Sequence, residues 1–82
     1  MQPTYPTKDT QEWKVLQCLL EADGAWINKQ HFIRDMYLTQ AGRAIFELQN
    51  RFHWNVEPSP FKDAHGFKSY RIVQKVRTLA LL

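Results

Sequence analysis

The chain has 82 residues, one cysteine, three tryptophans, three tyrosines and five phenylalanines, and its formal net charge is +3 at pH 7. One cysteine excludes an internal disulfide, and this length allows one small domain with a modest core. The sequence has no signal peptide and no apolar run of membrane-spanning length, so we expect a cytoplasmic protein without a membrane partner.

The charge is unevenly distributed along the chain. Residues 1–38 contain four Lys/Arg and five Asp/Glu, a net charge of −1, whereas residues 39–82 contain seven Lys/Arg and three Asp/Glu, a net charge of +4. A basic half suits a polyanionic partner, although many soluble domains also have one basic half.

The first part of the chain predicts a tail followed by a helix. Residues 1–8 contain two prolines and no periodic pattern, which indicates a flexible tail. Asp9 followed by Glu12 has the spacing of a capping box, with Asp9 as the cap. The apolar spacing then predicts a helix over about residues 10–22, within which Cys18 is expected to be a small buried hydrophobe.

A short strand and a second helix are predicted next. Residues 25–27 are apolar and too few for more than a brief strand. Asn28 is a suitable cap for a helix over residues 29–36. Its expected buried residues are Phe32, Ile33 and Met36. Leu38 would then occupy the elbow between this helix and the next.

The pattern over residues 39–52 predicts a third, amphipathic helix with Thr39 as its cap. Its apolar stripe consists of Leu38, Ala41, Ile45, Leu48 and Phe52. The opposite side carries Gln40, Arg43, Glu47 and Asn50, with Phe46 at its edge. Arg, Gln and Asn can form paired hydrogen bonds with guanine or adenine edges. Gly42 inside the helix suggests close approach of the preceding helix or of a phosphate backbone.

After Arg51 the period becomes alternating, which predicts a hairpin that pairs residues 53–57 with residues 68–73. Pairing is expected to fade at Pro58 and Pro60, which lack the amide donor, and the loop is expected to turn at His65-Gly66. The apolar tail over residues 76–82 has three open alternatives: packing on the domain, contacting a second copy in a homodimer, or fraying.

Three stretches resemble small winged helix-turn-helix domains common in phages and prophages. They are Leu38–Arg51 (LTQAGRAIFELQNR), Trp54–Glu57 (WNVE) and Gly66–Ile72 (GFKSYRI), and the similarity extends over about residues 10–73. The resemblance implies an α+β fold with three helices, a short strand and a C-terminal β-hairpin wing, within a domain of residues 9–75. It also implies that the third helix enters the major groove and that the wing, residues 58–67, contacts the backbone or minor groove.

Residue chemistry and the resemblance together give the candidate DNA contacts. Arg43 is the leading base reader, with a solvated arginine beside Glu47 as the alternative, whereas Arg51 suits a phosphate. The amino end of the second helix suits a phosphate as well. The full set is Asn28, Lys29, Thr39, Gln40, Arg43, Phe46, Glu47, Asn50, Arg51, Lys62, His65, Lys68 and Arg71.

The sequence therefore predicts a sequence-specific double-stranded DNA-binding protein, a phage or mobile-element transcriptional regulator or excision factor. The alternative is a protein-interaction module on the same scaffold, such as a small phage inhibitor of a host protein, which Phe46 and Glu47 favour. We expect no enzyme and no cofactor, because no nucleophile elbow or phosphate-binding loop is present. The spacings of the metal-ligand types match no common zinc site; these residues are Cys18, His31, His53 and His65.

Overall fold

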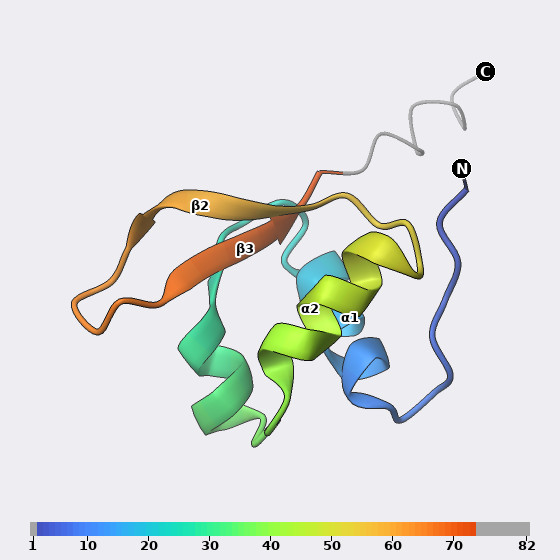
Figure 1. The fold of residues 1–82 in the computed structure, drawn as a ribbon, viewed down its shortest axis with the longest axis horizontal. Helices are drawn as coiled ribbons and strands as arrows, with labels where there is room; N and C mark the ends of the chain where they lie inside the picture. The colour runs from blue at the N-terminus through green and yellow to red at the C-terminus, as the bar shows by residue number, and fades with distance from the viewer. Residues whose placement is uncertain (1, 74–82) are drawn as a thin grey trace.

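The computed structural model describes residues 2–73, which form a small α+β domain. Within that range there are three helical segments and a three-stranded antiparallel sheet (Figure 1). The elements in chain order are α1 (Gln11–Glu21), β1 (Ile27–Asn28), η1 (His31–Asp35), α2 (Ala41–Asn50), β2 (Val56–Lys62) and β3 (Lys68–Ile72). None of the helices in the described range is long and apolar enough to cross a bilayer. The predicted domain end at residue 75 and the tail 76–82, with its dimer contact, lie outside the described residues.

One apolar core lies between the helices and the sheet side that faces them. α1 and α2 pack against each other, while α1 also contacts β3 and α2 contacts β2. Full burial of each large aliphatic or aromatic side chain stabilises the fold by roughly 1.5–3 kcal/mol. The buried apolar residues are Val15, Leu16, Leu19, Phe32, Leu38, Ala41, Ala44, Ile45, Leu48, Trp54, Val56 and Ile72. The stripe predicted for the third helix is therefore confirmed, with Phe52 half-buried at its end.

The start of α1 corrects one prediction. The cap is Thr10, whose Oγ1 accepts a hydrogen bond from the Trp13 N–H at 3.2 Å, and not Asp9. Asp9 instead has a φ of 72° and precedes the helix. Both residue types can cap, so the pattern did not settle which neighbour does. The helix ends near the predicted place, with Asp23 and Gly24 in the left-handed region.

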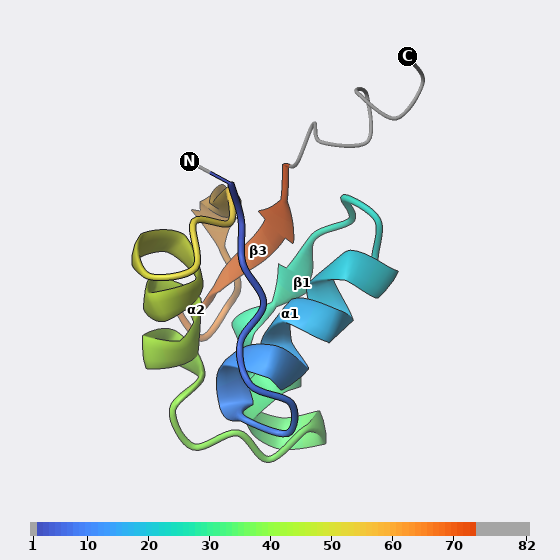
Figure 2. The same cartoon turned by 90° about the vertical axis from the view of Figure 1, so that its right-hand side faces the viewer.

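The N-terminal segment contacts the domain at several points. The Thr4 N–H donates to the Phe52 carbonyl at 2.9 Å, and the Trp54 Nε1–H donates to the Thr4 carbonyl at 2.6 Å. The Tyr5 ring meets Trp54 edge-on, and Pro6 is buried. Figure 2 shows the segment passing along α1 and α2. The sequence pattern predicted a flexible tail here; the structure instead anchors Thr4 to Pro6 on the domain.

The second helical segment is not the regular α-helix that was predicted. Asn28 does accept a first-turn hydrogen bond, from the Gln30 N–H at 2.8 Å. From His31 onward, however, the chain forms one turn of π-helix, closed by the Met36 N–H bonding to the His31 carbonyl. The wider turn changes the angular step between side chains. Phe32 is buried as predicted, but Ile33 is 38% exposed, so its expected burial was wrong.

The sheet has β3 at its centre, with β1 and β2 as its edges. Val56 pairs with Ile72, and the ladder continues to Lys62, which pairs with Lys68 across a bulge that begins after Pro58. The prediction that pairing fades at the prolines is confirmed in part: regular pairing is interrupted after Pro58, but it resumes at Lys62, beyond Pro60. The predicted strand start at residue 53 was wrong, because β2 begins at Val56. An edge strand tolerates proline because one of its two sides has no neighbouring strand. Figure 1 shows the tip of the β2–β3 hairpin projecting past the helices.

Ser59 explains how the proline-containing strand stays paired. Its side chain is only 1% exposed, and its Oγ accepts a hydrogen bond from the Ser69 N–H at 2.9 Å. The same hydroxyl donates to the Phe61 carbonyl at 2.6 Å. The hydroxyl therefore replaces the ladder bonds that the bulge removes, and it does so inside the protein, where unmet polar groups are costly.

Candidate functional site

The outward side of α2 presents polar side chains beside one large aromatic ring. Gln40, Arg43 and Asn50 are exposed, and Phe46 is 60% exposed. The ion pairs found within residues 2–73 are His31–Asp35 and Glu57–Arg71, so Arg43 and Glu47 form no ion pair there; Arg43 is a solvent-exposed arginine. A helix buried on one side thus offers hydrogen-bonding groups on the other.

A shallow groove of about 200 Å³ runs beside this surface, between the amino end of α1 and α2. Two arginines and two glutamates contribute to it, so its charge is mixed. Its lining residues are Gln11, Glu12, Gln40, Arg43, Ala44, Glu47 and Arg51. Arg51, predicted to contact a phosphate, lies with its guanidinium 5.2 Å from the centre of the Phe52 ring.

The amino end of α2 is closed by a residue of another helix. The Gln11 Oε1 accepts a hydrogen bond from the Gln40 N–H at 2.9 Å, and its Nε2 donates to the Thr39 Oγ1 at 3.3 Å. The predicted cap Thr39 was therefore wrong: no side-chain cap from its own segment is present at the start of α2. At the other end, the Asn50 side-chain amide donates to the Phe46 carbonyl at 2.9 Å. The Asn50 side-chain oxygen has no bond within residues 2–73.

Two lysines of the hairpin lie on the helix-facing side of the sheet, and a third lysine directly follows β1. Lys62 and Lys68 are directly opposed across the β2–β3 hairpin, and alternation places Lys68 on the same side as the buried Ile72. Lys29 directly follows Asn28, whose partner in β3 is Ser69, the chain neighbour of Lys68. We call Lys29, Lys68 and Lys62 the lysine row.

The lysine row reaches α2 at Gly42. A Cβ on Gly42 would lie 3.1 Å from the Lys29 Nζ, so the absence of a side chain makes room for this ammonium group. Of the two approaches predicted for Gly42, the structure contains the one from the preceding helix. Within residues 2–73 none of the three lysines has an ion pair, although like charges directly opposed across strands destabilise a hairpin.

Arg71 differs from these lysines in both position and partners. It lies on the opposite face of the sheet, where its Nη2 is 2.6 Å from the Glu57 Oε1. Its guanidinium also covers the Trp26 ring at 4.3 Å, and Trp26 meets Phe61 edge-on. Arg71, a candidate DNA contact like Lys62 and Lys68, is therefore separated from them by the sheet, and its charge is balanced by Glu57.

Asp63 organises the tip of the hairpin. Its Oδ1 accepts hydrogen bonds from the His65 N–H at 2.8 Å and the Phe67 N–H at 2.9 Å. Its Oδ2 accepts from the Gln30 Nε2 at 2.6 Å and the Asn28 Nδ2 at 3.1 Å. The Phe67 N–H contributes most to lowering the pKa of Asp63. Desolvation, the second-largest effect, opposes it, and the His65 amide and the Gln30 and Asn28 side chains each lower the pKa further.

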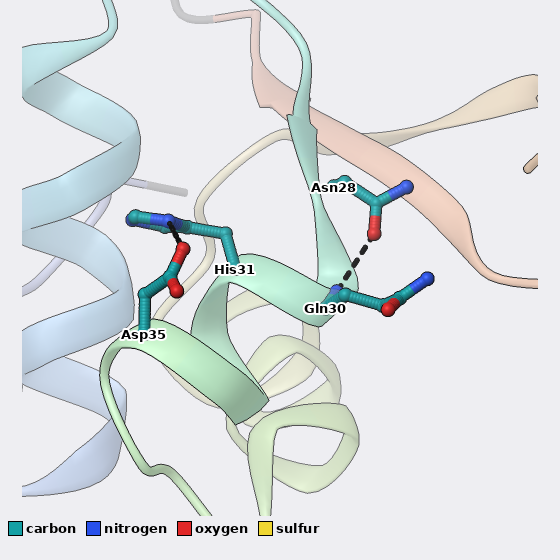
Figure 3. A network of polar contacts seen from close by, with 4 residues as sticks. All are labelled: Asn28, Gln30, His31 and Asp35. Atoms are coloured by element: carbon teal, nitrogen blue, oxygen red, sulfur yellow. Dashed lines mark hydrogen bonds and ion pairs between the residues drawn. The ribbon is translucent and has the colours of Figure 1, made fainter.

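Two further candidate DNA contacts, Asn28 and His65, belong to this network. Figure 3 shows the Asn28 side-chain oxygen bonded to the Gln30 backbone, and the Asn28 amide nitrogen donates to Asp63. The His65 side chain is exposed at the turn, next to Gly66, which has a φ of 84°.

A second open groove, of about 290 Å³, lies between α1 and η1, lined by Trp13, Lys14, Gln17, Cys18, Glu21, His31 and Met36. Burial and the nearby Glu21 carboxylate raise the pKa of the half-buried Cys18, and the His31 Nδ1 bonds to the Asp35 carboxylate at 2.9 Å (Figure 3). In residues 2–73 no three His, Cys, Asp or Glu side chains are grouped so as to hold a metal ion.

Sequence reasoning missed Gln11, Gln30, Ser59 and Asp63. Only Asp63 had a local signal: Asp63-Ala-His-Gly66 has the composition of a turn in which Asp accepts from amides two or more residues ahead. Comparison of the chain with protein-family models, curated proteins and solved structures returned no match.

Proposed function

We propose that this chain is a winged helix-turn-helix protein that binds double-stranded DNA in a sequence-specific manner. In this proposal α2 enters the major groove and the β2–β3 hairpin lies against the phosphate backbone. The observation that carries it is the juxtaposition of the lysine row, which has no ion pair within residues 2–73, with the exposed polar side of α2.

The dimensions of α2 and its outward side chains suit the major groove. Ten residues give a helix about 15 Å long, and the groove is about 12 Å wide. Arg43 has the donors to bind guanine at two points, and Gln40 can bind adenine in the same way. Asn50 has its oxygen and one amide hydrogen left for a base edge after its bond to Phe46.

The lysine row supplies the contacts to the backbone. A phosphate beside Lys29 would lie at Gly42, one residue from Arg43, so backbone and base contacts would adjoin. Lys62 and Lys68 would gain an anion between two ammonium groups that otherwise repel each other. The resemblance to phage and prophage domains leads us to propose a transcriptional regulator or an excision factor.

The test is selection from a pool of random duplexes at low salt, followed by binding measurements on single variants. Arg43→Ala is expected to weaken binding to the selected site by about 1–3 kcal/mol and to relax the preference at one position. Lys68→Ala is expected to weaken binding to all duplexes alike, whereas Lys14→Ala, an exposed lysine of α1, serves as the matched control. A wild-type protein that binds no duplex would overturn the proposal.

Exposed aromatic rings favour a second candidate, a protein-interaction module on the same scaffold. Tyr37 is 82% exposed in the turn before α2, and Phe46 is 60% exposed on the outward side of α2. Aromatic residues are enriched at the centres of protein interfaces. A protein partner that remains bound after nuclease treatment, and is lost on Phe46→Ala, would favour this function over DNA binding.

A further inference from the structure

The hydrogen-bond network of Asp63 joins two parts of the domain that are distant in sequence. One carboxylate oxygen holds the turn of the hairpin through the His65 and Phe67 amides. The other oxygen holds the Asn28 and Gln30 side chains at the start of the second helical segment. We call these contacts the Asp63 brace. With four donors the carboxylate has its ordinary hydrogen-bonding capacity filled.

The brace and the lysine row share the same short stretches of chain. Each lysine is next in the chain to a residue of the brace: Lys29 to Asn28 and Gln30, Lys62 to Asp63, and Lys68 to Phe67. Asn28 pairs with Ser69, on the opposite side of the sheet from Lys68. Because the backbone joins each lysine to a residue held in the brace, the brace restricts the positions from which the three lysine side chains extend.

We propose that Asp63 is a positioning residue for phosphate binding by the lysine row. It contacts no phosphate itself. It holds the hairpin tip against the start of the second helical segment, and so keeps three mutually repelling ammonium groups close enough to bind adjacent phosphates. This inference rests on the proposed function, because it names the element that prepares the backbone-binding surface.

The positioning role and the charge of Asp63 predict opposite effects of Asp63→Asn on DNA binding, so one substitution distinguishes them. Asp63→Asn removes a negative charge from a protein that is proposed to bind a polyanion, so charge alone predicts tighter binding. The Asn side chain keeps the size of Asp but replaces one acceptor oxygen with a donor, which cannot accept from Gln30 or Asn28. We therefore expect weaker binding, by about fivefold, and a shallower dependence on salt concentration as lysine contacts are lost.

The measurement is fluorescence anisotropy of a labelled duplex at several salt concentrations. Asp23→Asn is the charge-matched control, because Asp23 lies outside the brace and its φ of 50° suits Asn. It should bind at least as tightly as wild type. Gln30→Ala retains the Asp63 charge and the hairpin turn but removes the 2.6 Å bond, and should also weaken binding.

The outcomes separate this inference from the proposed function. If wild type binds duplex and Lys68→Ala binds it less tightly, but folded Asp63→Asn and Gln30→Ala bind as well as wild type or better, the positioning role is overturned and the proposed function stands. If Asp63→Asn does not fold, duplex binding by Gln30→Ala alone is compared with wild type, and binding as tight as wild type or tighter overturns the positioning role. A wild-type protein without duplex affinity overturns both.

Discussion

The side chain of Gln11 accepts a hydrogen bond from the Gln40 N–H at 2.9 Å, so the first residue of α1 caps the start of α2. The four amides at the start of a helix lack partners within it, and a side chain from elsewhere in the fold meets this need as well as a local cap does. This bond fixes the amino end of α2 on α1, next to the exposed Arg43.

Gln11→Ala is therefore expected to destabilise the domain by about 1 kcal/mol, the usual effect of losing a helix cap. Thr39→Ala should have a smaller effect, because the Thr39 hydroxyl accepts only the 3.3 Å bond from Gln11 and caps no amide of α2. Urea denaturation of both variants measures whether Gln11→Ala lowers the free energy of unfolding more than Thr39→Ala does. A larger loss of stability for Thr39→Ala would indicate that Thr39 caps α2, as the sequence predicted.

Gly42→Ala is expected to raise stability while weakening DNA binding. Alanine in place of a helical glycine stabilises by up to about 1 kcal/mol, or roughly 4–8 °C in Tm for a domain of this size. The added Cβ would meet the Lys29 Nζ at 3.1 Å, and this flexible end of a side chain must move away. Thermal melting and duplex binding on the same sample test both parts, and unchanged affinity would argue against a role for Lys29.

Ser59→Ala is expected to destabilise the domain by about 1–3 kcal/mol, because it removes the acceptor of the buried Ser69 N–H bond. Ser69→Ala is the matched control: it changes a serine of the adjacent strand but keeps the amide that bonds to Ser59. Chemical denaturation should show little loss of stability for Ser69→Ala. Equal losses for both variants would contradict the role assigned to the Ser59 hydroxyl.

The pKa of Asp63 should lie below its ordinary value of 3.8 and rise toward it in Gln30→Ala, which removes one donor. A lowered pKa in the folded state means that the ionised group adds stability above the ordinary value, and that this is lost as the pH falls through the folded pKa. Carboxyl carbon shifts measured by NMR between pH 2 and 6 give both values. An unshifted pKa in wild type would contradict the four-donor arrangement.

Local periodicity was sufficient to predict most of the elements. One side of a helix or strand is buried, and the spacing of apolar residues in the sequence shows which side it is. This holds for the apolar stripe from Leu38 to Leu48 and for the alternation around Ile72. Capping was predicted less well, since Asp9 and Thr10 are both suitable cap types, and only the structure shows that Asp9 has a φ of 72° while Thr10 accepts the bond from the Trp13 N–H. No local sequence pattern predicts the π-helical turn at η1.

The exposed polar side of the third helix was predicted, but the bonding partners of the candidate residues were not. Residue types pointed to Arg43 and the lysines, whereas the pairing of Arg71 with Glu57 depends on the strand register. The bonds of Asp63 to Asn28 and Gln30 join residues more than thirty positions apart, which no sequence window contains. Contacts of this kind decide which charges are balanced within the protein and which are available to a ligand.

The most direct test of the central claim is an NMR titration of the ¹⁵N-labelled protein with a selected duplex. Binding through α2 and the lysine row predicts the largest amide shift changes at Gln40, Arg43 and the three lysines, with small changes at Trp26 and Cys18. No change with any duplex, or changes confined to the Trp26 face of the sheet or the groove around Cys18, would contradict the account.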